Sequence, residues 1–164
     1  MVTIFYGTVI VMAETQLTKD VKKTLLLYTK ADQLGIYGCY EVCFGYNEEY
    51  CDFMTMDSKN VFRCYEIKSS MGDLRSKAKL TFKGDFNYIV IPEELFEKDS
   101  VQEILKPYLW RGVGVLLYRR KDNGNINIHE LQKAKRQTLY IGDRVKIMDY
   151  MVRSLSRYTT KLFM

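Results

Sequence analysis

The chain has 164 residues, enough for one domain with its own core, and its apolar content of 47% and charged content of 27% are ordinary for a globular protein. Two prolines and ten glycines, with no internal repeat or low-complexity tract, exclude a disordered linker and a repeat array. The net charge of +5 is uneven, because residues 111–164 carry twelve lysines and arginines against four aspartates and glutamates. This basic last third favours a polyanionic partner, although a solvated surface explains it equally well.

The first twelve residues, MVTIFYGTVIVM, are apolar, but they are too few to cross a membrane and lack the basic start of a signal peptide. They form either an extra strand or an extension ahead of a second natural start at Met12. Without an export signal, we expect a cytoplasmic protein with no membrane partner and with its four cysteines reduced. Their spacing contains no C-x-x-C pair, which favours small apolar residues within strands over a metal site.

In chain order, the first predicted element is a helix over residues 14–31, where apolar side chains recur at helical spacing. Three strands are predicted next, over 37–44, 50–57 and 61–69. A second helix is predicted over 70–80, with Ser70 as its N-cap and Asp73 as the capping-box partner. The fully apolar strand that follows, over 86–92, is expected to be buried on both faces.

A helical segment over 93–109 is expected to be interrupted before Pro107, because proline disfavours helical geometry in the residue before it. A fifth strand over 112–120 and a short strand over 126–131 follow, and the second of these places the single histidine, His129, at the surface. The order of these elements predicts an α/β sandwich with a mixed sheet, formed by a single domain. Within it, residues 13–130 are the expected core and residues 131–164 a basic helical extension.

The last predicted helix covers residues 143–163 and is amphipathic. Its apolar side is expected to dock on the core through Val145, Met148, Val152 and Leu155, flanked by Met151, Tyr158 and Leu162. Its basic side is either solvated or lies along phosphates, and is formed by Lys146, Arg153, Arg157 and Lys161.

The hairpin of strands 50–57 and 61–69 brings two carboxylates together if residues 58–60 form its loop. In that register, Met54 faces Cys64, and Asp52 faces Glu66 at the far end of the pair. Side-chain alternation then places Asp52, Glu66 and Lys68 on one face that is otherwise apolar. Opposed carboxylates repel each other, so this arrangement favours a divalent cation between them, with Mg²⁺ or Mn²⁺ completed by water ligands.

A cation held in this way binds a phosphodiester oxygen and lowers the pKa of a bound water. The ammonium group of Lys68 is placed to orient that water or to stabilise charge on the phosphorus. The pattern therefore predicts a metal-dependent phosphodiesterase centre. The competing interpretation is an ion pair of Glu66 with Lys68 at a strand end, beside an unrelated Asp52 in solvent.

Asp52 followed by Glu66-Ile67-Lys68 resembles the signature of the PD-(D/E)XK nuclease superfamily, although Cys51 stands where the family name has proline. A closer likeness, over about residues 13–135, is to the MmcB-like group of DNA-repair proteins. In that group the third strand ends in EIKSS, an Asp and an Arg open the next helix, and a later strand ends in proline. The matching residues here are Glu66 to Ser70, Asp73, Arg75 and Pro92.

The resemblance implies a restriction-endonuclease-like αβββαβ core and a Mg²⁺-dependent deoxyribonuclease of DNA repair or recombination. It implies that Asp52, Glu66 and the carbonyl of Ile67 hold the metal, that Lys68 is catalytic, and that Glu41 holds water or a second ion. Candidates for DNA phosphate contacts are Arg75, Lys77, Lys79, Arg153 and Arg157. Many members of the superfamily act as dimers, so a homodimer is also allowed.

Two other classes of function remain open. A non-catalytic nucleic-acid-binding protein that keeps the fold is the main alternative, and its affinity would fall steeply with salt. A protein-interaction module anchored by Trp110 and Tyr108 ranks last, because a lone tryptophan beside strands is usually part of the core.

Overall fold

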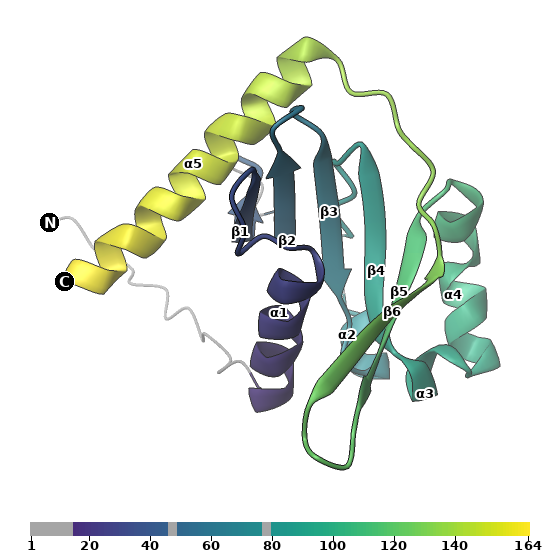
Figure 1. The fold of residues 1–164 in the computed structure, drawn as a ribbon. Coiled ribbons are helices and arrows are strands. Elements are labelled where there is room, and N and C mark those ends of the chain that lie inside the picture. Colours follow the sequence, from purple (N-terminus) through teal and green to yellow (C-terminus); the bar gives the residue numbers. More distant parts are fainter. Residues whose placement is uncertain (1–14, 46–48, 77–79) are drawn as a thin grey trace, which may run out of the picture.

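A six-stranded sheet forms the centre of the protein, with its strands in the order β1-β2-β3-β4-β5-β6 (Figure 1). The structure is a computed structural model that describes residues 15–45, 49–76 and 80–164. Strands β3, β4 and β5 run parallel to one another, and the pairs β1–β2, β2–β3 and β5–β6 are antiparallel, so the predicted α/β class with a mixed sheet is confirmed. The strands are β1 (Ile36–Cys43), β2 (Tyr50–Asp57), β3 (Phe62–Ile67), β4 (Phe86–Pro92), β5 (Gly114–Arg120) and β6 (Ile126–Gln132).

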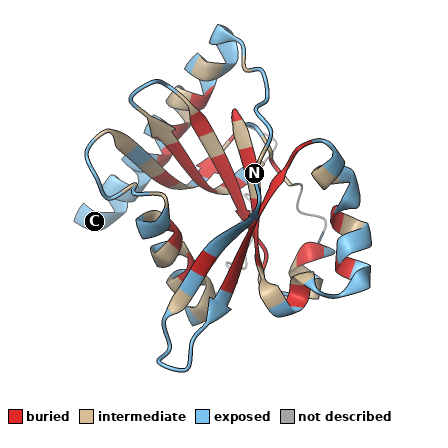
Figure 2. Ribbon diagram, turned by 45° about the vertical axis from the view of Figure 1, so that its right-hand side comes forward, coloured by how far each residue is buried: buried red, intermediate tan, exposed pale blue. Residues whose placement is uncertain are grey.

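Helices cover both faces of this sheet. On one face α1 (Gln16–Tyr28) buries Val21 and Leu25 against a cluster that includes Phe53 and Val90. The opposite face is covered by α5 (Ile141–Phe163) over β1 to β3, and by α3 (Glu93–Phe96) and α4 (Asp99–Trp110) over β4 and β5. Figure 2 shows that burial is concentrated in the strands, while each helix is buried along its inner side.

Most predicted elements agree with the structure, because the hydrophobic periodicity that predicts them depends on residues close together in the chain. The predicted strands match β1 to β6 within two residues at either end, and all four cysteines lie in β1, β2 or β3. His129 is exposed on β6, as expected. Within the described residues, no helix is both long and apolar enough to cross a membrane.

The second helix is shorter than predicted. Ser70 does cap α2 (Met71–Leu74), since its hydroxyl accepts the N–H of Asp73 at 3.1 Å. The Asp73 carboxylate accepts the N–H of Ser69 at 3.0 Å instead of closing the expected capping box on Ser70. The helix ends at Leu74, so its predicted extension to residue 80 is wrong where the chain is described. Lys77, Lys79 and residues 1–12 lie outside the described part of the chain.

The expected interruption before Pro107 is also wrong, because α4 continues through Pro107 to Trp110. The proline stands in the last turn, and the carbonyl that it deprives of a partner belongs to Glu103, which is exposed. The break in this segment falls instead at Lys98, between α3 and α4. Trp110 is 76% exposed at the end of α4 with Lys106 over its ring, so its expected core position is wrong as well.

The side on which the last helix docks overlaps only in part with the predicted one, since Met151 is buried and Met148 packs against the same cluster. Ile147, Met151 and Ser154 are buried against the sheet. In contrast, Val145 and Val152 of the predicted docking face are 55% and 64% exposed. In the first turn of α5, Arg144 binds both oxygens of the fully buried Asp85 at 2.6 and 2.9 Å, an ion pair that favours the observed rotation of the helix. A helical wheel counts apolar residues and cannot register an ion pair with a distant part of the chain.

Candidate functional site

The register of the β2–β3 hairpin is the one predicted. Met54 pairs with Cys64 and Met56 with Phe62. The paired rungs end at Phe53 and Tyr65, so the predicted ladder pair of Asp52 with Glu66 is not formed. The carboxylate of Asp52 instead accepts the N–H of Ile67 at 2.7 Å, and this bond ties the start of β2 to the end of β3.

Side-chain alternation breaks at this rung on β2 and on its other neighbour, β1. Cys51 and Met54 both lie in the cluster under α5, although they are three residues apart, while Phe53 faces α1. On β1 the same change of phase occurs at Glu41, whose φ of +50° is in the left-handed region. The predicted common face of Asp52 with Met54 is therefore wrong, and Cys51 occupies that place. Left-handed backbone at a residue other than glycine is costly and is often found at functional sites.

Asp52 lies at the start of β2, partly buried. Burial raises the pKa of its carboxyl group, and the Ile67 N–H and the ammonium groups of Lys68 and Lys22 oppose this shift. Asp52 is therefore not the solvent-exposed acid of the competing interpretation. It is a carboxylate whose negative charge is only partly balanced by its surroundings.

Glu66 lies near the end of β3 and is 2% exposed. Burial, followed by the nearby negative charge of Asp52, raises the pKa of Glu66 to about 9. One of its carboxyl oxygens accepts the N–H of Thr81 at 2.9 Å. No bond from the described residues reaches the second oxygen of Glu66, or the second oxygen of Asp52. One oxygen of each carboxyl group is thus left for a further ligand.

Lys68 follows directly after β3 and is only 6% exposed. Its ammonium group lies 3.5 Å from the Asp73 carboxylate of α2, so its ion-pair partner is Asp73 and not Glu66. Because Asp73 also accepts the N–H of Ser69, the start of α2 holds the lysine beside the two carboxyl groups. The predicted three residues are thus gathered at one end of β2 and β3, but with Asp73 as a fourth member.

Glu41, the fourth predicted acid, turns toward α1. Its carboxylate lies 3.1 Å from the ammonium group of Lys22. Burial opposes ionisation of Glu41, but Lys22 and the Tyr158 hydroxyl outweigh it, and the pKa of Glu41 is lowered. Glu41 is therefore stably ionised and paired, unlike Asp52 and Glu66.

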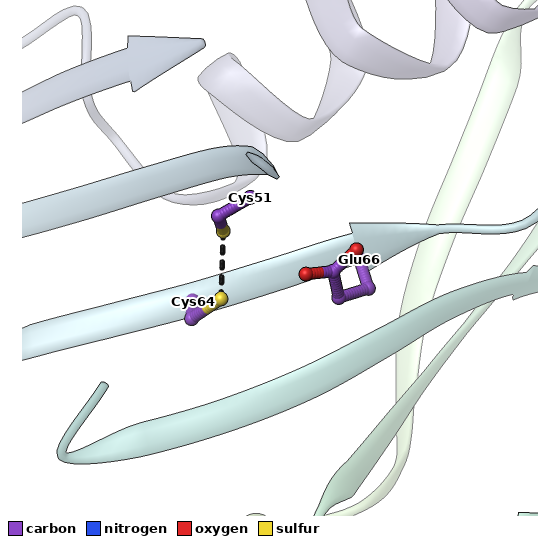
Figure 3. A group of neighbouring side chains, drawn as sticks. All are labelled: Cys51, Cys64 and Glu66. Carbon is purple, nitrogen blue, oxygen red and sulfur yellow. Dashed lines mark hydrogen bonds between the residues drawn. The ribbon is translucent and has the colours of Figure 1, made fainter. Parts of the chain in front are cut away.

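Two buried thiols adjoin the carboxyl groups. The sulfur atoms of Cys51 and Cys64 are 2.6 Å apart, and a Glu66 oxygen lies within 4.8 Å of both (Figure 3). The Cys64 thiol also donates to the carbonyl of Thr81 at 2.8 Å. Burial raises the pKa of both thiols, which keeps them protonated at neutral pH.

Two hollows lie beside these residues. One, of about 150 Å³, is lined by Glu41 and Tyr50 and by the basic side chains of Arg157 and Lys161 on α5. The other, of about 510 Å³, is lined by Thr81, Lys83, Tyr108 and Arg111. Each hollow carries cationic side chains, and the second is linked to the candidate acids through Thr81, whose N–H binds Glu66.

The predicted phosphate contacts are placed differently from one another. Arg157 lines the hollow beside Glu41, and its guanidinium donates to Ser154 at 2.9 Å. Arg153 is exposed and pairs with Asp149 one turn earlier at 2.9 Å. Arg75 is exposed at the end of α2.

Several residues of this site carry no sequence signal of their own. Lys22 is one of several lysines on an amphipathic helix, and Thr81 acts through its backbone N–H. Asp85, which holds both Arg144 and the N–H of Phe62, precedes an apolar strand as a single acid in a loop. Only contacts between distant segments give these residues their roles.

Comparisons with known proteins bear on the fold alone. No family model matches the chain, and no curated protein matches it. Among solved structures, it is similar to the SPO1766 protein of unknown function from Silicibacter pomeroyi, with 18% identity and a TM-score of 0.63. That similarity covers 91% of this chain and 92% of the other. At this level of identity, the likeness supports the α/β architecture and carries no activity with it.

Proposed function

We propose that the protein is a Mg²⁺-dependent nuclease of the PD-(D/E)XK type that hydrolyses DNA phosphodiester bonds in repair or recombination. The observation that carries the proposal is the pair of acids at the ends of β2 and β3. Asp52 and Glu66 both have raised pKa values through burial, each has an oxygen without a described partner, and Lys68 lies beside them.

The donor set suits a hard divalent cation. Two carboxyl oxygens, completed by water, are the ligands that Mg²⁺ prefers, and Mn²⁺ accepts the same set. Burial, and after it the charge of Asp52, raises the pKa of Glu66, and a bound cation would offset this by stabilising the ionised carboxylates. The carbonyl of Ile67, the residue whose N–H already holds Asp52, is the proposed third protein ligand.

When bound, Mg²⁺ supplies a Lewis acid that polarises the phosphodiester and acidifies a water molecule. Asp52 and Glu66 hold it through the oxygens that Ile67 and Thr81 leave open. Lys68 places a positive charge beside them, where it orients the attacking water or stabilises charge on the phosphorus. Asp73 is a positioning residue, since it fixes the ammonium group of Lys68.

Basic side chains beside the acids support DNA as the substrate. Arg157 and Lys161 line the hollow next to Glu41, and Lys83 and Arg111 line the hollow next to Thr81. Cations near a metal site provide contacts for the phosphates that flank the cleaved bond.

The test is cleavage of single-stranded, duplex and branched DNA with Mg²⁺ or Mn²⁺ by the wild-type protein and by Lys68→Ala. We expect the variant to lose about 100-fold or more in rate while its circular dichroism stays unchanged. Lys106→Ala is the matched control, because Lys106 is an exposed lysine on α4 that pairs with Glu103. Cleavage by Lys68→Ala at the wild-type rate would refute the catalytic assignment.

The low exposure of Glu66 favours the alternative of a non-catalytic nucleic-acid-binding protein. The same experiment separates the two proposals. A wild-type protein that binds DNA in a salt-dependent manner, but cleaves none of the three substrates with either metal, would support the alternative.

A further inference from the structure

The break in alternation at Asp52 has brought two thiols into contact. In the register of the hairpin, Cys64 lies opposite Met54 and not opposite Cys51. The change of phase turns Cys51 to the same face as Cys64, and the two sulfur atoms lie 2.6 Å apart. This is closer than two sulfur atoms that share no bond normally approach.

The spacing of the sulfur atoms favours a bond between them over a shared metal ion. A disulfide needs a separation of about 2.05 Å, which is a small closure from the present contact. Two thiolates on one tetrahedral zinc ion would lie about 3.8 Å apart, given Zn–S bonds of about 2.3 Å, so the pair would have to open. The pair lies on two adjacent strands of one sheet, joined by backbone hydrogen bonds from Phe53 to Met56.

We propose that Cys51 and Cys64 form a reversible disulfide, and that this modification weakens cation binding at Asp52 and Glu66. The second part rests on the proposed function, and the first part does not. With hydrogen peroxide as the oxidant, the sulfur of one thiol attacks a peroxide oxygen, the O–O bond breaks, and a sulfenic acid and one water form. The second thiol then displaces the hydroxyl group of the sulfenic acid, so that the S–S bond forms and a second water leaves. A dithiol reductant reverses the reaction by thiol–disulfide exchange.

The link to the acids passes through Thr81. The Cys64 thiol donates to the carbonyl of Thr81 at 2.8 Å, and the N–H of the same Thr81 donates to Glu66 at 2.9 Å. A disulfide has no S–H group, so oxidation removes the first bond and leaves Thr81 less firmly placed under Glu66. On the other strand, Cys51 directly precedes Asp52, so a shift of its backbone moves that carboxylate as well.

Both sulfur atoms are fully buried, so the oxidant reaches them only when the strands open locally. The pair therefore responds to sustained oxidation and not to a brief pulse. The strand pair nearest the sheet edge, β1 with β2, is the part whose opening would expose Cys51.

The first experiment is independent of any activity. The double variant Cys39→Ser/Cys43→Ser keeps only the proposed pair; it is treated with hydrogen peroxide, denatured and alkylated. We expect a mass lower by two hydrogen atoms, no alkylation, and a cross-linked peptide joining positions 51 and 64 that a dithiol reductant separates. Cys51→Ser in the same background is the control, and it should show no such loss of mass. Alkylation of both thiols after prolonged oxidation would overturn the proposal.

The second experiment compares the reduced and oxidised forms of the double variant by calorimetric titration with Mn²⁺. We expect affinity to fall on the order of tenfold on oxidation and to return on reduction, as for other changes in groups that support metal ligands. Equal affinities would overturn the link to the acids. A reduced protein that binds no Mn²⁺ would refute the proposed function instead, while the mass measurement decides the disulfide on its own. Thiolate-to-metal absorption bands on adding Co²⁺ to reduced protein would assign the pair to a metal site and also overturn the proposal.

Discussion

The position of Glu66 in the candidate site makes the stability of the folded protein depend on pH. Its carboxyl group is buried near Asp52, and the pKa of about 9 means that the folded protein without metal holds a proton there at neutral pH. The unfolded chain would lose that proton near its ordinary pKa of 4.5. The contribution of Glu66 to stability is therefore fully present below about pH 4.5, and it is lost as pH rises toward 9.

Glu66→Gln should remove this dependence, because an amide does not ionise. We expect the metal-free variant to be more stable than the wild type at pH 8, by on the order of a few kcal/mol, with the difference vanishing near pH 5. Urea unfolding of both proteins across this range measures the effect. If the difference in free energy of unfolding between the variant and the wild type is the same at pH 5 and at pH 8, the raised pKa of Glu66 is contradicted.

Asp52→Asn should weaken Mg²⁺ and Mn²⁺ binding, because it removes one charged ligand. The amide oxygen can still accept the Ile67 N–H, so the fold should persist. Without metal, the variant should melt at a higher temperature than the wild type, since an amide avoids the cost of burying the Asp52 charge, the main cause of its raised pKa. Calorimetric titration with Mn²⁺ tests the first point, and an unchanged affinity would exclude Asp52 as a ligand.

Among the helices and strands, the placement of α5 depends on one ion pair. Arg144 in its first turn binds Asp85, which is fully buried and also accepts the N–H of Phe62 at the start of β3. Burial opposes ionisation of Asp85, but Arg144 and the Phe62 N–H outweigh it and lower its pKa. The pair thus joins α5 to the hairpin that carries the candidate acids.

Arg144→Ala should destabilise the protein by on the order of 3 kcal/mol, because it leaves the Asp85 charge buried without its main partner. Arg153→Ala on the same helix is the control, since its pair with Asp149 is exposed, and it should cost less than about 0.5 kcal/mol. Thermal unfolding of the two variants gives the comparison. Equal losses would show that the buried pair does not fix α5.

In the whole molecule, basic side chains from segments far apart in the chain lie near Glu41, beside the candidate acids. Lys22 comes from α1, and Arg157 and Lys161 come from α5. Glu41 is the residue on which these two helices converge, through Lys22 on one side and Tyr158 on the other.

If the protein binds DNA as proposed, Arg157→Glu should weaken binding several-fold and reduce its dependence on salt, because it removes a proposed phosphate contact. Lys106→Glu, the same change of charge on α4 over the far strands of the sheet, should have a smaller effect. Fluorescence anisotropy with labelled DNA at several salt concentrations measures both. Equal losses of affinity would mean that DNA binding depends on the net charge of the protein and not on the basic side chains of α5.

The agreement between sequence and structure is greatest where contacts are local. The hairpin register follows from the short loop at residues 58–60 and from alternating apolar residues, and Met54 does pair with Cys64. The mixed sheet follows from a hairpin and then apolar strands separated by helical segments. Asp52, Glu66 and Lys68 could be selected from the same pattern, because each stands near a strand end.

What the sequence by itself determined is therefore the kind and chain order of the strands, the register of the β2–β3 hairpin, and the three residues near its open end. Only the tertiary structure decided that Asp52 leaves the ladder to hold Ile67, that Lys68 pairs with Asp73, and that α5 docks through Ile147 and Met151. Periodicity depends on neighbours a few residues apart, so it predicts elements well. A break in alternation, a buried ion pair and a contact between two thiols depend on segments far apart in the chain, and these are settled only when the whole chain is packed.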